Sequence, residues 1–151
     1  MPGASYINFN AGTTGSVMVE GRISSSAIVG EGSDVGGGAS ILGVLSGTDG
    51  NPISVGRNCL LGANSVCGIP LGDGCIIDAG IAILEGTKVG INAVELQKIM
   101  DVNTNMKMEG EIFKGKQLAG LYGIHYRQNS LTGEITASRS TREIKLNADL
   151  H

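Results

Sequence analysis

The chain has 151 residues, a net charge of −3 and 25 glycines, with three tyrosines, two phenylalanines and no tryptophan. Its mild negative charge does not favour binding to nucleic acid. The sequence contains no long apolar run that predicts a membrane span and no leader that predicts a secretion signal. We therefore expect one soluble, cytoplasmic domain whose core is aliphatic rather than aromatic.

A repeat with a step of six residues dominates the first two thirds of the chain. Residues 1–10 lack it and are expected to form a lead-in strand, whereas residues 11–94 carry it. The aliphatic members are Ala11, Val17, Ile23, Val29, Val35, Ile41, Val55, Leu61, Leu71, Ile77, Ile83 and Val89. A step of six fits neither a helix nor simple strand alternation, and it is typical of a parallel β-helix of hexapeptide repeats. Three hexads close one coil, so twelve predict an all-β fold of about four coils, with each aliphatic residue pointing into the bore.

Small residues complete each hexad. Glycine often follows the aliphatic residue, at positions 30, 36, 56, 62, 72 and 90, where we expect tight corners that need backbone angles unsuited to a Cβ. Cys59 and Cys75 occupy the small fifth position and are expected to be buried fillers, whereas Cys67 lies in an interruption and is expected to be partly exposed. No cluster of cysteine and histidine predicts a zinc site.

Two excursions interrupt the repeat. Residues 47–52 form a polar turn cluster, and residues 67–70 form a shorter insertion. Loops that leave a solenoid on one side often line its binding site, although a tolerated insertion is the alternative.

Residues 95–151 are expected to form a C-terminal extension. Residues 94–100 have helical spacing, 101–110 are polar and predict a loop, and 122–127 with 134–137 predict a β-hairpin around 129–133. Residues 144–151 are expected to be extended. Four bare coils would leave flat faces exposed, which favours burial in a cyclic trimer.

Register within the repeat gives the candidate site. The only histidines, His125 and His151, lie outside the coils, so we expect the first to pack in the hairpin and the second to fray. A regular coil stacks Glu20 over Gly38, Asn64 and Gly86, beside a second column of Val19, Gly37, Ala63 and Glu85, and it places Arg22 over Ser40. A carboxylate beside glycines has room for a ligand, and a column of small residues could form the floor for an extended pantetheine arm. Alternatively, the glycines merely satisfy corners.

Four segments, residues 10–16, 18–23, 33–40 and 60–65, resemble the tetrahydrodipicolinate N-succinyltransferases of bacterial lysine and diaminopimelate synthesis. Family members have a further N-terminal domain, so the resemblance implies a fragment or a short member. It also implies left-handed winding, a homotrimer with active sites between subunits, succinyl-coenzyme A as co-substrate and no metal. Glu20 would be the catalytic residue, as general base or as transient acyl-anhydride carrier. The implied donor contacts are Arg22, Gly37, Ser40, Ala63, Asp78, Ala79, Gly86 and Lys98, with Arg127, Gln128, Asn129 and Ser130 near the far end of the coenzyme.

The chemistry of these residue types agrees with that assignment. A carboxylate can accept the proton that the amine loses as it attacks a thioester, which is worth about 10²- to 10⁴-fold in rate. Backbone N–H groups at Gly43 could hold the oxyanion, and the fork of Arg22 suits a substrate carboxylate. Lys98 and Arg127 could bind coenzyme phosphates or be solvated surface charges. The alternatives are a hexapeptide acyltransferase with another donor or acceptor, and a non-catalytic trimeric coil domain.

Overall fold

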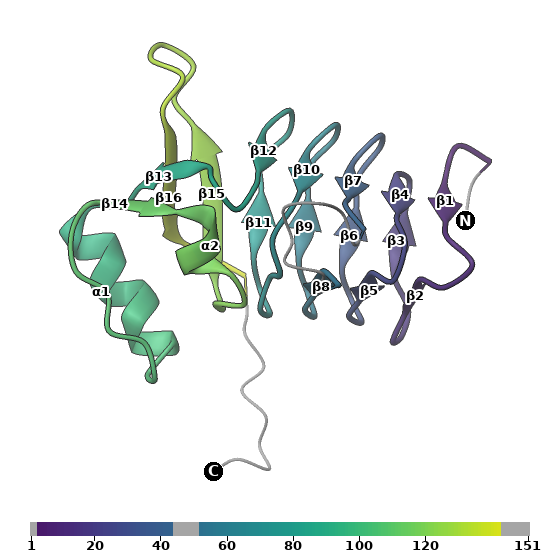
Figure 1. Cartoon of the computed structure of the whole chain (residues 1–151), viewed down its shortest axis with the longest axis horizontal. Coiled ribbons are helices and arrows are strands. Elements are labelled where there is room, and N and C mark those ends of the chain that lie inside the picture. Colours follow the sequence, from purple (N-terminus) through teal and green to yellow (C-terminus); the bar gives the residue numbers. More distant parts are fainter. Residues whose placement is uncertain (1–2, 44–51, 143–151) are drawn as a thin grey trace.

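The computed structural model describes residues 3–43 and 52–142. Short parallel strands stack into a left-handed β-helix of about four coils, followed by a helix and a hairpin, so the predicted fold class is confirmed (Figure 1). The predicted excursion at residues 47–52 lies almost wholly outside the described residues, and so does the predicted extended tail at residues 144–151.

Three parallel sheets form the walls of the solenoid. The first sheet contains β1 (Tyr6–Ile7), β4 (Arg22–Ile23), β7 (Ser40–Ile41), β10 (Val66–Cys67) and β12 (Ala82–Ile83). The second contains β3 (Met18–Val19), β6 (Asp34–Val35), β9 (Leu60–Leu61) and β11 (Ile76–Ile77). The third contains β2 (Gly12–Thr13), β5 (Ile28–Val29) and β8 (Ser54–Val55), which Leu71 extends through a bridge to Val55. The predicted lead-in strand is β1, which pairs with β4.

The repeat residues fill the bore, as predicted, but the first coil has a different register. Val19, and not Val17, pairs with Val35, while Val17 is only partly buried at the edge of the core. The reason is the corner between β3 and β4, which contains only Glu20 and Gly21, whereas four residues separate β6 from β7. This first coil is therefore two residues shorter than the next.

Cys67 is a member of the repeat, which corrects the prediction that it lies in an insertion and is partly exposed. It pairs with Ile41 in the preceding coil and Ile83 in the next, and its side chain is fully buried. The shortening falls after it, where only residues 68–70 separate Cys67 from Leu71. Burial raises the pKa of the Cys67 thiol to about 12.

The glycines that follow the aliphatic residues have a different physical reason from the one predicted. Gly36 and Gly62 are not among the positive-φ glycines, which in the coils include Gly32, Gly38, Gly74 and Gly80. Instead, a Cβ on Gly36 would lie 2.6 Å from the Leu61 carbonyl oxygen. Close approach of successive coils, and not backbone angle, therefore excludes side chains at these positions.

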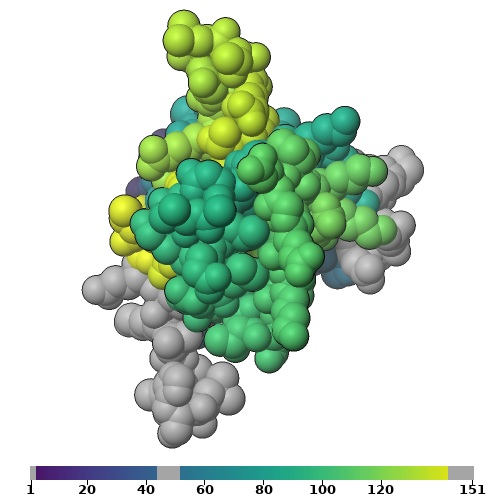
Figure 2. Space-filling view, turned by 90° about the vertical axis from the view of Figure 1, so that its left-hand side faces the viewer, coloured from purple at the N-terminus to yellow at the C-terminus, as the bar shows by residue number. Residues whose placement is uncertain are grey.

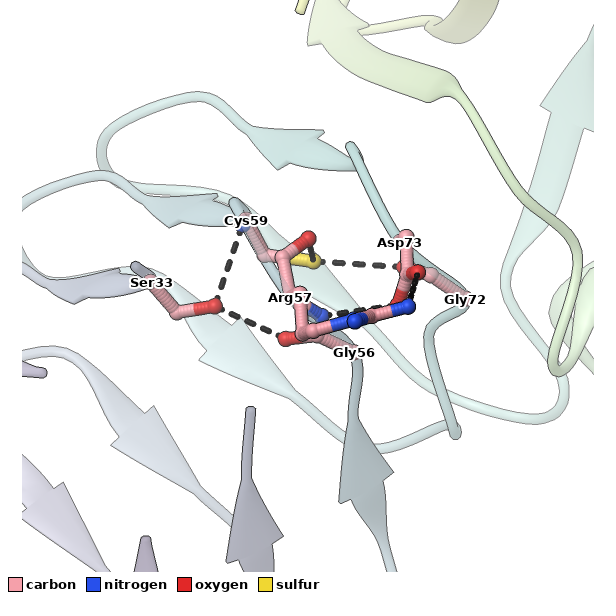
Figure 3. A network of polar contacts seen from close by, with 6 residues as sticks. All are labelled: Ser33, Gly56, Arg57, Cys59, Gly72 and Asp73. Carbon is pink, nitrogen blue, oxygen red and sulfur yellow. Dashed lines mark hydrogen bonds and ion pairs between the residues drawn. The ribbon is translucent and has the colours of Figure 1, made fainter. Parts of the chain in front are cut away.

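Polar contacts tie neighbouring coils together at one corner (Figure 3). The Ser33 hydroxyl donates to the Gly56 carbonyl at 2.8 Å and accepts from the Cys59 N–H at 3.0 Å, and the Cys59 thiol donates to Gly72 O at 3.2 Å. Beside them, the Arg57 N–H donates to Asp73 Oδ1 at 2.8 Å. The buried polar groups at this corner are in this way satisfied across coils.

The C-terminal extension closes one end of the solenoid. The predicted helix is α1 (Ala93–Val102), capped by the Asn92 side chain, which accepts from Glu95 N–H at 2.9 Å. The predicted hairpin is β15 (Ile124–Gln128) with β16 (Ile135–Arg139), and β15 continues the second sheet beyond β11. Tyr126 stacks on Ile77 and is fully buried, so the core of the coils continues into this extension.

β13 (Lys88–Gly90) is the strand of the last predicted repeat residue, Val89, whereas two elements of the extension were not predicted: β14 (Ile112–Lys114) and α2 (Gly115–Leu118). β13 pairs antiparallel with β14 and parallel with β16. Figure 2 shows this end of the molecule, with α1 in front and the hairpin projecting above it. Within the described residues, no helix has the length and apolar character needed to cross a bilayer.

Candidate active site

Glu20 occupies the shortened corner of the first coil. Its backbone is fixed on both sides, because its N–H donates to Val35 O at 2.8 Å and its carbonyl accepts from Gly38 N–H at 3.2 Å. Its side chain is exposed, and a Cβ on Gly37 would lie 3.9 Å from Glu20 Oε2. The carboxylate therefore stands over a surface without side chains, as the sequence predicted.

The corners between the second and first sheets stack along one line, which we call the Glu20 edge (residues 20–21, 36–39, 62–65 and 78–81). Backbone hydrogen bonds set its register: Asn64 N–H donates to Gly37 O and Gly80 N–H donates to Ala63 O, each at 2.9 Å. Glu20 thus stands above the glycines of the second coil, Ala63 and Asn64 of the third, and Ala79 and Gly80 of the fourth. The sequence prediction is correct for the second and third coils.

The predicted columns are wrong at their ends. Val19 faces the bore opposite Val35 and is not part of the surface column. Glu85 and Gly86 lie in the corner that follows β12, on a different edge, and the fourth coil supplies Ala79 and Gly80 instead. The cause is Cys67: because it belongs to the repeat, the chain reaches the fourth coil one hexad earlier than the sequence suggested.

Arg22 and Ser40 begin β4 and β7, immediately after the Glu20 edge. They are register partners, and Arg22 Nε donates to Ser40 Oγ at 3.0 Å, which confirms the predicted stacking. The hydroxyl orients the guanidinium through Nε and leaves its terminal N–H groups facing outward, in the fork geometry that suits a carboxylate.

The far end of the Glu20 edge carries a chain of three polar side chains. Asp78 Oδ1 lies 2.6 Å from His125 Nε2, and the Arg127 guanidinium lies 3.1 Å from His125 Nδ1 through Nη2 and 3.3 Å through Nε. The register of β11 with β15 brings these groups together. Asp78 and Arg127 were predicted site residues, but the link through His125 was missed. The alternation of His125 and Arg127 along a strand was visible in the sequence, whereas the pairing with β11 was not.

The remaining predicted residues are not brought beside Glu20. Gly43 lies in the corner after β7, where a Cβ would be 2.9 Å from Ser25 N, and Gly86 lies in the equivalent corner after β12. Lys98 is on α1, with its amine 3.3 Å from Glu95. Gln128 ends β15, and Asn129 and Ser130 lie at the hairpin turn, which Asn129 shapes by accepting from Leu131 N–H at 2.9 Å.

A cavity of about 680 Å³ opens between α1, β13, β14 and β16, and no pattern in the sequence predicted it. Arg127 and Arg139 line it together with Glu95, Glu111 and Glu134. The Arg139 N–H donates to the Glu95 carboxylate at 2.9 Å and, with Lys98, holds the pKa of that carboxyl below its usual value. In the part of the chain that the structure describes, no group of three His, Cys, Asp or Glu side chains is arranged to hold a metal ion.

The coil geometry and the stacked small corners define a hexapeptide-repeat β-helix, and comparison with known proteins agrees. Residues 52–85 match the family described as the hexapeptide repeat of succinyl-transferase. The whole chain is 76% identical to the 2,3,4,5-tetrahydropyridine-2,6-dicarboxylate N-succinyltransferase of Sulfurovum sp., and 66% identical to the protein of that name from Campylobacter jejuni. It spans 38% and 39% of their lengths, respectively.

A solved structure points the same way. A 2,3,4,5-tetrahydropyridine-2-carboxylate N-succinyltransferase from Campylobacter jejuni matches 92% of this chain and 36% of its own, with a TM-score of 0.85 and 65% sequence identity. Over its whole length the chain is therefore similar to part of the tetrahydrodipicolinate N-succinyltransferases, in agreement with the resemblance of its sequence motifs.

Proposed function

We propose that the protein is an acyltransferase that moves a succinyl group from succinyl-coenzyme A to the amine of 2,3,4,5-tetrahydropyridine-2,6-dicarboxylate. The observation that carries this proposal is the Glu20 carboxylate, exposed beside Gly37 at the start of an edge lined by small residues. The names of the relatives, which are 59–76% identical over the chain, support the same reaction.

In this reaction Glu20 acts on the attacking amine. The cyclic imine first adds water, so that its nitrogen becomes a secondary amine. This nitrogen loses a proton as it bonds to the thioester carbonyl, a positioned carboxylate can accept that proton directly, and coenzyme A leaves as the thiol when the C–S bond breaks. A transient acyl-anhydride on the same carboxylate is the alternative route. Arg22, oriented by Ser40, would bind a carboxylate of the succinyl group or of the acceptor.

The donor lies along the Glu20 edge. Gly37, Ala63 and Ala79 present small side chains on successive coils, and Asp78 and Arg127 continue the line at its far end. Five rungs at about 4.8 Å span roughly 19 Å, which suits an extended arm ending in phosphates. Arg127 would contact those phosphates, with Gln128, Asn129 and Ser130 beyond it.

The site is completed by a second copy of the chain. The oxyanion argument places Gly43 near the donor, and the family resemblance does the same for Gly86. Both residues lie on a different edge from Glu20. Both edges can face one donor only if neighbouring copies pack edge against edge, and a cyclic trimer does this three times. Light scattering should give a mass about three times 15.4 kDa. A monomer at micromolar concentration would contradict the shared site.

A reducing compartment fits this chemistry. Cys59, Cys67 and Cys75 are free and buried, and free thiols are typical of the cytoplasm, where we place the reaction.

Donor preference tests the proposed function. We expect coenzyme A release to depend on the dicarboxylate acceptor and to be faster with succinyl- than with acetyl-coenzyme A, because only the former offers a carboxylate to Arg22. Equal turnover of the two donors would favour a hexapeptide acyltransferase of different specificity. Absence of release with either, in a protein that is folded and trimeric, would favour a non-catalytic coil domain.

A further inference from the structure

The direction of the long Arg127 side chain depends on its neighbours. It lies on β15 two residues after His125, so the two side chains share the outward face of the strand while Tyr126 between them points into the bore. Arg127 is exposed, and a long exposed guanidinium samples many rotamers unless a neighbour holds it. The contacts that hold it here are those of Nε and Nη2 to His125 Nδ1, at 3.3 and 3.1 Å.

That contact assigns the tautomer of the ring. A guanidinium only donates, so Nδ1 must offer its lone pair. The proton of the neutral imidazole therefore sits on Nε2, which donates to Asp78 Oδ1 at 2.6 Å. Asp78 thus fixes both the orientation of the ring and the nitrogen that can accept from Arg127.

The arrangement is held by the fold on each side. Pairing of Ile76 with His125 and of Ile77 with Tyr126 brings the end of β11 beside the ring, whose side chain is only 13% exposed. Glu95, which lines the same cavity as Arg127, accepts from the Arg139 N–H and pairs with Lys98. A ring that is nearly buried between two strands can hold a flexible arginine more firmly than water can.

We infer that His125 is a positioning residue: held by Asp78, its ring aims the Arg127 guanidinium at the phosphate end of the donor. This inference rests on the proposed function, in which Arg127 meets the coenzyme. His125 itself touches no reacting atom. Its contribution is to order Arg127 before the donor arrives, so that binding does not bear that cost.

The tautomer can be observed without any ligand. In ¹⁵N-labelled protein, the His125 ring should show a protonated Nε2 and an unprotonated Nδ1 at neutral pH, and Asp78→Asn should shift that balance. A ring protonated at Nδ1 would overturn the inference, whatever the donor does.

Two substitutions separate the two sides of the ring. His125→Asn places an amide oxygen close to the position of Nδ1 and can still accept from Arg127, whereas His125→Gln places a donor near Nε2 and loses that acceptor. Calorimetry with coenzyme A should show near wild-type binding for His125→Asn and about two- to tenfold weaker binding for His125→Gln. kcat should be unchanged in both variants, because Glu20 lies at the opposite end of the edge.

A double-mutant cycle then shows whether His125 acts through Arg127. Arg127→Ala should weaken coenzyme A binding, and adding His125→Gln to it should weaken binding no further. An undiminished effect of His125→Gln in the Arg127→Ala background, or wild-type binding by His125→Gln alone, would overturn the inference. If Arg127→Ala binds coenzyme A normally, the inference also fails, while the donor-preference assay still decides the proposed function independently.

Discussion

Gly30 and Gly56 lie against each other in consecutive coils, so closely that a Cβ on Gly30 would be 2.6 Å from the Gly56 carbonyl carbon. Gly30 is buried and donates its N–H to Val55 O at 2.8 Å. The absence of side chains at these corners therefore helps to set the distance between successive coils.

Gly30→Ala should therefore destabilise the protein by about 1–3 kcal/mol, because backbone cannot yield as a flexible side chain can. Gly12→Ala is the matched control: Gly12 also lies in a coil strand, but a Cβ there meets nothing within 4 Å. The control should change stability by less than about 1 kcal/mol. Chemical denaturation of both variants measures the difference, and equal effects would mean that close approach does not govern these glycines.

How far the sequence predicted the fold follows from this periodicity. A step of six residues requires stacked coils, and the inward positions were recognised because aliphatic side chains occupy them. Cys67 was missed because cysteine is not obviously aliphatic, although in the bore it fills the position that Ile41 and Ile83 fill in the neighbouring coils. Because this hexad was not recognised, Gly86 was assigned to the Glu20 edge, although it lies in the corner after β12.

The candidate site was predictable only where coils are regular. Glu20, Gly37, Ala63 and the Arg22–Ser40 pair follow from short-range register. The contact between Asp78 and His125 joins residues 47 positions apart through the pairing of β11 with β15. Such pairing depends on how the chain folds back after α1, which no local pattern encodes.

Because Cys67 is buried, we predict that the stability of the protein falls at alkaline pH. Because burial raises its pKa from an ordinary value of 9.0 to about 12, the folded state holds the thiol proton more tightly than the unfolded state. The stabilisation is complete below pH 9 and is lost as pH rises from 9 towards 12.

Cys67→Val keeps an apolar side chain in the bore and removes this titration. Between about pH 8 and pH 10.5 the wild type should lose roughly 2 kcal/mol more than the variant in its free energy of unfolding. Denaturant titrations at the two pH values measure this difference directly. Parallel declines in the two proteins would show that Cys67 does not control the alkaline loss.

If the donor lies along the Glu20 edge, a larger side chain at Ala63 should affect donor kinetics selectively. Its side chain is exposed on the Glu20 edge, so Ala63→Leu adds bulk to the surface without entering the core. We expect a higher KM for succinyl-coenzyme A, by about tenfold, because a displaced donor buries fewer apolar atoms and each CH₂ group left in water costs about 0.8 kcal/mol. The trimer should persist in light scattering. Unchanged donor kinetics would show that the donor does not run along this edge.

The two chemical routes at Glu20 can be separated by mass spectrometry. Supplying succinyl-coenzyme A without acceptor should leave a succinyl adduct on Glu20 if the carboxylate carries the acyl group. A pure general base would remain unmodified under the same conditions.

Turnover of Glu20→Gln tests the central claim most directly. The amide fills the same space but can neither accept the proton nor carry the acyl group, so kcat should fall by about 10²-fold or more while coenzyme A binding changes little. Glu109→Gln, which alters an exposed carboxylate in the loop after α1, should keep wild-type turnover. Wild-type turnover by Glu20→Gln would contradict both chemical routes and the assignment of the site.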